Sequence, residues 1–106
     1  MIEYRLLREI ESNPRHTQRS LASSLDISLG KANYVLSGLI AKGVVKARKL
    51  GRPSSIRWRY VLTPMGMREK VRMTRDYLRR RLDEYERIRR EIELLKQEVG
   101  AVDDVR

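Results

Sequence analysis

The sequence predicts a mainly α-helical α+β domain with one β-hairpin and a long C-terminal helix. Three observations predict this class. Apolar residues recur at helical spacing as far as Lys42, they alternate with basic residues from Val44 to Leu62, and neither glycine nor proline occurs between Gly66 and Gly100. The chain has 106 residues, which is enough for one domain with at most one appended element.

The first part of the sequence contains three predicted helices, each with one apolar face. The first helix covers residues 2–11 and ends before Pro14. Thr17 is the expected N-cap of a short second helix that ends near Asp26, and Ser28 is the expected N-cap of a third helix. A tight turn joins the second helix to the third. The positions expected to be buried are Ile2, Leu6, Leu7, Ile10, Leu21, Ala22, Leu25, Ala32, Val35, Leu36 and Leu39.

A β-hairpin is predicted from the two runs VVKARKL and IRWRYVL, which the segment GRPSS separates. The second run alternates apolar residues with basic ones, so one face of the hairpin should be apolar and the other basic. We expect Trp58 and Tyr60 to lie on the apolar face and to belong to the core, not to form a platform for stacked bases.

The long helix should begin at Thr63-Pro64, because a capping residue followed by proline is a typical helix start. A helix over residues 64–99 would be roughly 54 Å long at 1.5 Å per residue, and its own chain cannot cover it. We expect its first turns, with Met67, Val71, Leu78 and Leu82, to pack on the first helix and the hairpin. A heptad pattern from Tyr85 onward predicts a homodimeric coiled coil. The predicted dimerisation residues are Leu78, Tyr85, Ile88, Ile92, Leu95 and Val99.

The charges flanking this seam favour parallel pairing of the two helices. In a parallel dimer Glu84 faces Arg89 of the other copy, and Glu91 faces Lys96, whereas antiparallel pairing sets like charges together. Each exposed pair contributes only about 0–1 kcal/mol. We expect the sequence to divide into one domain over residues 1–63 and a dimerisation helix over residues 64–106, which ends in a short disordered tail.

The charge of the chain is uneven. The formal net charge is +10, and residues 1–63 hold twelve basic and four acidic side chains. Such an excess favours nucleic acid as the partner over an anionic membrane surface, because the basic cluster lies on a hairpin and not on an amphipathic helix. The N-terminus has no continuous apolar run, so we expect a cytoplasmic protein without a signal peptide or membrane contact.

The order helix, helix, turn, helix, hairpin, long helix is that of a winged helix-turn-helix, in which the third helix enters the major groove of DNA. The stretch HTQRSLASSLDISLGKANYVLSGLIAKGVVKAR resembles the MarR-type winged-helix regulators, and within them the short branch associated with exopolysaccharide genes. The resemblance implies a homodimeric transcriptional regulator, with exopolysaccharide genes as its targets. Asp26 stands where many relatives have glycine.

The resemblance implies that residues 28–42 form the recognition helix. Lys31 can reach guanine or phosphate, Asn33 has the donor and acceptor that fit adenine, and Tyr34 offers a hydroxyl to phosphate or an apolar edge to a thymine methyl group. Gly30 lets the start of the helix approach a phosphate closely. The expected base-facing residues are Ser28, Leu29, Gly30, Lys31, Asn33, Tyr34 and Ser37.

The hairpin is the predicted wing, with six cations and no acid over residues 44–62. In the tip RKLGRPSSIR, Arg52 is flanked by glycine and proline, and it can insert into a narrow minor groove. The alternative is a solvated turn, with only Lys49, Arg57 and Arg59 on phosphates. Further DNA contacts are expected from helix 2 and the wing, through Thr17, Gln18, Arg19, Lys46, Arg48, Lys49, Arg52, Arg57 and Arg59.

Two other functions remain open from the sequence. An architectural protein would bind DNA through phosphates with little sequence preference. A protein-interaction module could use the same fold, although a docking wing has no reason to exclude acidic residues. No enzyme, metal or cofactor is expected, because the chain lacks cysteine, has only His16 as a histidine, and shows no nucleophile with a base. We expect His16 to be a surface residue near the start of the second helix. No site for a small-molecule effector is evident.

Overall fold

The fold was determined as a computed structural model, which describes residues 1–51 and 57–104. Its elements confirm the predicted order and the winged-helix fold: α1 (Ile2–Ser12), α2 (Gln18–Leu25), α3 (Leu29–Ala41), β1 (Val45–Leu50), β2 (Arg57–Leu62) and α4 (Pro64–Asp104). The chain forms two compact units, Met1–Met73 and Thr74–Arg106, and the functional division at residue 63 stays a prediction. α4 continues past the predicted end at residue 99, because a single interior glycine costs a helix only about 1 kcal/mol. Of the expected disordered tail, residues 100–104 are helical, and residues 105–106 lie outside the described part.

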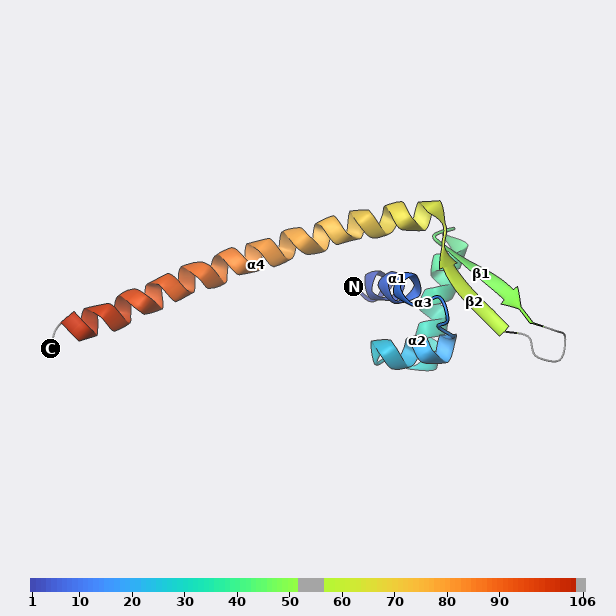
Figure 1. Ribbon diagram of the computed structural model, residues 1–106, viewed down its shortest axis with the longest axis horizontal. Coiled ribbons are helices and arrows are strands. Elements are labelled where there is room, and N and C mark those ends of the chain that lie inside the picture. The colour runs from blue at the N-terminus through green and yellow to red at the C-terminus, as the bar shows by residue number, and fades with distance from the viewer. Residues whose placement is uncertain (52–56, 105–106) are drawn as a thin grey trace. The chain divides into compact units, whose positions relative to one another are not determined.

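The core of the first unit lies between the three short helices and one face of the hairpin (Figure 1). The apolar stripes of α1, α2 and α3 meet there, as their helical spacing predicts. Tyr60 joins them from β2, and Val35, which was expected to be buried, is only half-buried at the edge. The largest side chains that are fully enclosed are Leu6, Leu7, Leu21, Leu36 and Val45.

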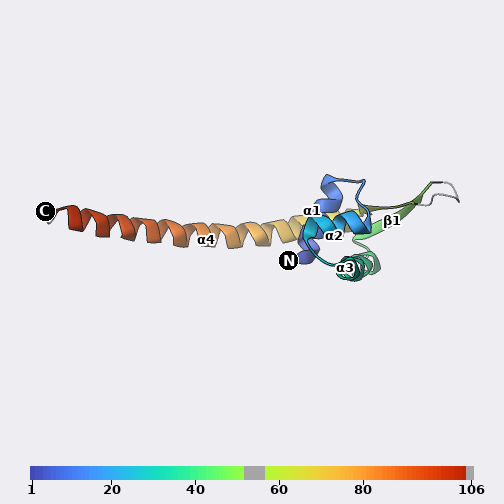
Figure 2. The same ribbon diagram turned by 90° about the horizontal axis from the view of Figure 1, so that it is seen from below.

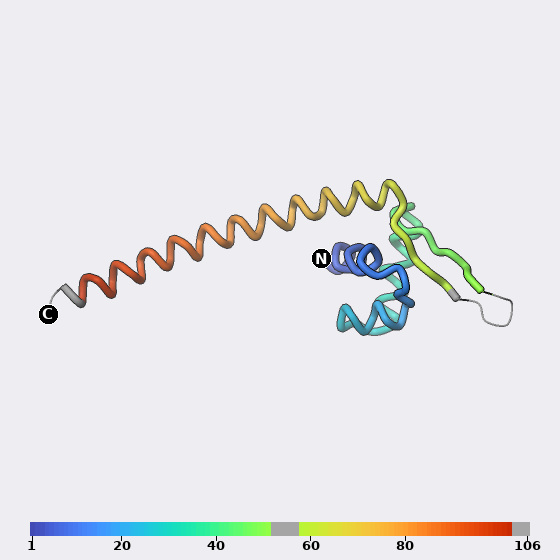
Figure 3. Tube along the Cα trace, in the orientation of Figure 1, coloured from blue at the N-terminus to red at the C-terminus, as the bar shows by residue number. Residues whose placement is uncertain are grey.

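The turn between α2 and α3 fixes the angle between these helices. Asp26 ends α2 in the left-handed conformation, with φ of 54°. This explains why an aspartate can stand where relatives have glycine, since Asp and Asn tolerate this region better than other side chains. Ile27 then packs against the core. In Figure 2 α3 is seen almost end-on while α2 lies across the view, and the trace in Figure 3 shows the short connection between them.

Thr63 fixes the start of α4. Its Oγ1 donates to the carbonyl of Gly43 and accepts from the amide of Gly66 at 3.0 Å. Gly66 faces the backbone of Val44 so closely that an added Cβ would lie 1.9 Å from the carbonyl oxygen. Only glycine therefore fits at this point of α4.

The face of α4 that packs on the core is not the one that the sequence suggested. Met67, Val71, Leu78 and Leu82 are about half exposed, and Met73 contacts the core instead. The contact at Gly66 sets the rotation of α4 about its axis, so that residues 66, 70 and 73 lie on the side toward the other helices. On this side Lys70 Nζ donates to Glu11 Oε1 at 2.7 Å. Met67, Val71, Leu78 and Leu82 therefore lie on a different face of α4, which the core does not cover. On the solvent side, the Arg72 guanidinium donates to Glu69 and lowers the pKa of its carboxyl.

His16 is buried, although the sequence suggested a surface position. The residue is 7% exposed. Nδ1 lies 2.8 Å from Ser20 Oγ, and Nε2 lies 3.0 Å from Glu9 Oε2. The ring thus joins the end of α1 to the start of α2. The expectation failed because Glu9, the partner that stabilises the buried ring, comes from the preceding helix.

Candidate nucleic-acid interface

The third helix, α3, has one buried face and one solvent face. Ser28 caps it by accepting from the amide of Lys31 at 3.1 Å, while Ala32, Leu36 and Leu39 enter the core. Tyr34, near the middle of the opposite face, is 81% exposed. All of the residues expected to face bases are exposed: Ser28, Leu29, Gly30, Lys31, Asn33, Tyr34 and Ser37.

Asn33 is held by its neighbours on this solvent face. Its Oδ1 accepts from Gln18 Nε2 at 3.1 Å and from Ser37 Oγ at 3.5 Å. The first bond links the start of α2 to α3, which orients the Asn33 amide before any ligand arrives. The Asn33 side chain can donate to a base edge as it stands, whereas a bidentate contact with adenine also uses Oδ1.

The start of α2 lies beside this face. Thr17 Oγ1 accepts from the amide of Ser20, and Ser20 Oγ accepts from the amide of Thr17, so the two form a capping box. Because Thr17 already satisfies the helix end, its hydroxyl is a weaker candidate for a phosphate than the exposed Arg19. The sequence pattern could not distinguish these two roles.

The register of the wing divides its cations between two faces. Arg48 pairs with Arg59 across the strands, whereas Lys49 pairs with Trp58. Because directly opposed residues share a face, Arg48 and Arg59 lie on the outer face together with Lys46, and Lys49 lies on the core-side face. The four cations of the wing whose side chains are described therefore do not form one basic surface. Arg52 lies outside the described residues, and so does the side chain of Arg57.

Trp58 does not belong to the core, contrary to the sequence prediction. It is 50% exposed, whereas Tyr60 on the same face is 6% exposed. The alternation of residues along a strand predicts which face a side chain lies on. It does not predict whether the core covers that face at every position. Trp58 is therefore not covered by the core, and an open groove borders it.

The predicted dimerisation residues form an exposed apolar stripe along α4. Leu78, Tyr85, Ile88, Ile92, Leu95 and Val99 are each between 46% and 62% exposed. In the single chain, Arg89 approaches Glu86 at 3.7 Å and Lys96 approaches Glu93 at 3.8 Å. Both are pairs along one helix at i, i+3. The pairing between two copies, and its direction, stays a prediction.

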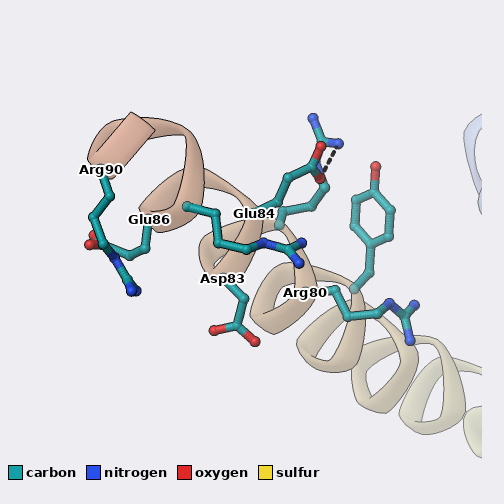
Figure 4. Close-up of a pocket in the computed structure, with 8 residues that line it drawn as sticks. Arg80, Asp83, Glu84, Glu86 and Arg90 are labelled. Atoms are coloured by element: carbon teal, nitrogen blue, oxygen red, sulfur yellow. Dashed lines mark hydrogen bonds and ion pairs between the residues drawn. The ribbon is translucent and has the colours of Figure 1, made fainter. Parts of the chain in front are cut away.

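A hollow on the surface of α4 is not a closed ligand site. All the residues that line it come from this one helix, and they include both acidic and basic side chains. Figure 4 shows Arg80, Asp83, Glu84, Glu86 and Arg90 projecting around the helix, with the bond from Arg81 Nη1 to Glu84 Oε2 at 3.0 Å. Within residues 1–51 and 57–104, no cluster of three or more His, Asp or Glu side chains could hold a metal ion. None of the helices described has the length and apolar character that a membrane span needs.

Residues 2–46 match the family described as winged helix-turn-helix DNA-binding. A comparison with curated proteins finds no match. Three solved structures share the fold over most of the chain. Transcriptional regulator PA4135 is 25% identical, with 91% of this chain and 74% of that protein covered and a TM-score of 0.61. Streptococcus pneumoniae FabT, in a complex with DNA, is 17% identical, with 98% of this chain and 76% of that protein covered and a TM-score of 0.58.

The third structure is the multiple antibiotic-resistance repressor MarR from Listeria monocytogenes, which is 20% identical, with 91% of this chain and 73% of that protein covered and a TM-score of 0.54. The chain therefore combines a winged helix-turn-helix DNA-binding domain with the fold of MarR-type regulators. The predicted resemblance is confirmed at this level. The exopolysaccharide-associated branch is not confirmed by these comparisons.

Proposed function

We propose that the chain is a homodimeric transcriptional regulator that inserts α3 into the major groove of double-stranded DNA. The observation that carries the proposal is the solvent face of α3, where Lys31, Asn33 and Tyr34 are all exposed. No acidic residue occurs from Ser28 to Lys42, so nothing on this helix repels phosphate. A helix of this kind, rigidly seated on a core, matches the recognition element of a winged helix.

The wing would hold the DNA backbone or the minor groove. Its core-side face carries Lys49, and in the sequence Arg52 falls between its two strands. On the outer face, Arg48 lies directly opposite Arg59. A bound phosphate would reduce the repulsion between these two like charges. Phosphate contacts of this type fix the position of a protein on DNA but carry no sequence information.

Dimerisation through α4 would place two recognition helices on successive turns of the DNA. The stripe from Leu78 to Val99 exposes a larger contiguous apolar surface than is usual for a helix in water. A second copy of the same helix would cover it. The resemblance in the sequence extends the proposal to the control of exopolysaccharide genes.

The test is a selection of binding sites from random DNA duplexes, followed by footprinting at two salt concentrations. We expect an inverted repeat to be enriched. Asn33→Ala should relax the preference at one position in each half-site by about 1–3 kcal/mol, whereas Gln97→Ala, which removes an amide from α4, should leave the preference unchanged. Enrichment of no sequence would contradict the proposal and favour the architectural alternative.

A further inference from the structure

An open groove lies beside the wing on the same surface as the start of α3. We call it the wing groove. It is lined by residues 17–19 at the start of α2, by Leu29 at the start of α3, and by residues 58–60 of β2. Every element that forms it belongs to the first compact unit.

Trp58 forms one wall of the wing groove. Half of this large apolar side chain is exposed, and burying such a surface on a partner is favourable. Its cross-strand neighbour Lys49 is also exposed on the same face. The wall therefore presents an aromatic ring that has an indole N–H donor, and Lys49 places a cation next to this wall without lining the groove.

The wing groove is positively charged. Arg19 borders it from α2, and Arg59 borders it from β2, where its Nη1 donates to the carbonyl of Trp58 at 3.1 Å. None of the described residues that line the groove is acidic. Its occupant should therefore be an anion with apolar parts, because it must satisfy the cations and cover the indole ring.

The position of the wing groove favours one such anion. The groove separates the start of α3 from the wing. If α3 lies in the major groove and the wing reaches the adjacent minor groove, then the strand of DNA between these two grooves must pass through this space. A sugar-phosphate chain supplies both the charge and the apolar deoxyribose surface.

We propose that the wing groove holds one sugar-phosphate strand of the DNA, with Trp58 in direct contact with it. This inference rests on the proposed function. The indole ring covers a deoxyribose, its N–H donates to a phosphate oxygen, and Arg19 and Arg59 neutralise the neighbouring phosphates. The contact adds affinity without sequence preference, because sugars and phosphates are the same at every position.

Trp58 is the only tryptophan of the chain, so its fluorescence reports on the wing groove directly. The full chain is titrated with a selected duplex while Trp58 emission is followed, and the anisotropy of a labelled duplex is followed in parallel. We expect both signals to change with the same midpoint. Trp58→Ala should weaken binding by about ten-fold, the factor for one hydrogen bond to a charged group, with the sequence preference unchanged.

Two further variants complete the test. Trp58→Phe retains the ring and loses the N–H donor, so its affinity should fall between those of the wild type and Trp58→Ala. Leu94→Ala removes an exposed apolar side chain from α4, outside the winged domain and outside the proposed seam, and should bind like the wild type. If anisotropy reports binding while Trp58 emission stays constant and Trp58→Ala binds normally, the inference is wrong and the proposed function stands. If no duplex binds, both are wrong.

Discussion

His16 joins two helices through both of its ring nitrogens. Replacing it with alanine leaves Ser20 and Glu9 without this partner and opens space inside the domain. We expect His16→Ala to lower the free energy of unfolding by about 1–3 kcal/mol, measured by denaturant titration. Arg15→Ala, at the exposed neighbouring position, should unfold like the wild type. Equal midpoints for the two variants would show that the ring contributes nothing.

Two glycines in helices are expected to respond in opposite ways to alanine. Gly66→Ala brings Cβ against the Val44 carbonyl, and since this neighbour is backbone, it cannot turn aside. We expect a loss of stability of about 1–3 kcal/mol, as for overpacked cores. At Gly38 an added Cβ meets nothing within 4 Å, so Gly38→Ala should stabilise α3 by about 1 kcal/mol. Thermal unfolding of both variants checks the pair, and a stable Gly66→Ala would mean that α4 starts elsewhere.

The residue scale also shows where sequence reasoning reaches its limit. The apolar spacing of α1 to α3 predicts buried residues such as Leu6, Leu21 and Leu36, because each helix has one covered face. The surroundings of His16 and Trp58 could not be predicted in this way. His16 depends on a partner from another helix, and Trp58 depends on where the core ends beneath a strand whose alternation continues past it.

At the scale of elements, α4 has two roles on different faces. Residues near Gly66 and Met73 attach it to the winged domain, and the stripe from Leu78 to Val99 remains exposed. Sequence periodicity identified the stripe but assigned its first residues to the core, because a heptad pattern does not say which face is covered by the same chain. The contact between Gly66 and the backbone of Val44 determines which face of α4 is covered.

The exposed stripe predicts the effect of charge on assembly. Ile88→Lys combined with Ile92→Lys places two cations in the proposed seam, where they would lose hydration on pairing. We expect monomers in sedimentation velocity, with DNA affinity reduced to that of a single half-site. Leu94→Lys introduces one such charge at a residue that is 61% exposed and lies outside the seam, and should remain dimeric. Dimers of the double variant would show that the seam is wrongly placed.

At the scale of the whole molecule, the proposed function depends on two properties: an uneven distribution of positive charge along the chain, and a fixed spacing between the two recognition helices of a dimer. Residues 1–63 carry most of the excess positive charge, which supplies affinity for any duplex and makes it dependent on salt. Charge alone therefore does not distinguish a regulator from an architectural protein. The distinction depends on the two recognition helices of a dimer, which must match the repeat of the double helix.

The spacing of the half-sites tests this geometry. A dimer with a fixed separation of recognition helices binds half-sites about 34 Å apart, one turn of DNA. Inserting about five base pairs between the half-sites rotates one of them by half a turn to the opposite side of the duplex. We expect the affinity, measured by anisotropy, to fall to that of a duplex with one half-site. The Ile88→Lys, Ile92→Lys monomer should not respond to the insertion, and an architectural binder would tolerate it as well. An unchanged affinity for the wild-type dimer would therefore exclude a rigid pairing of two recognition helices.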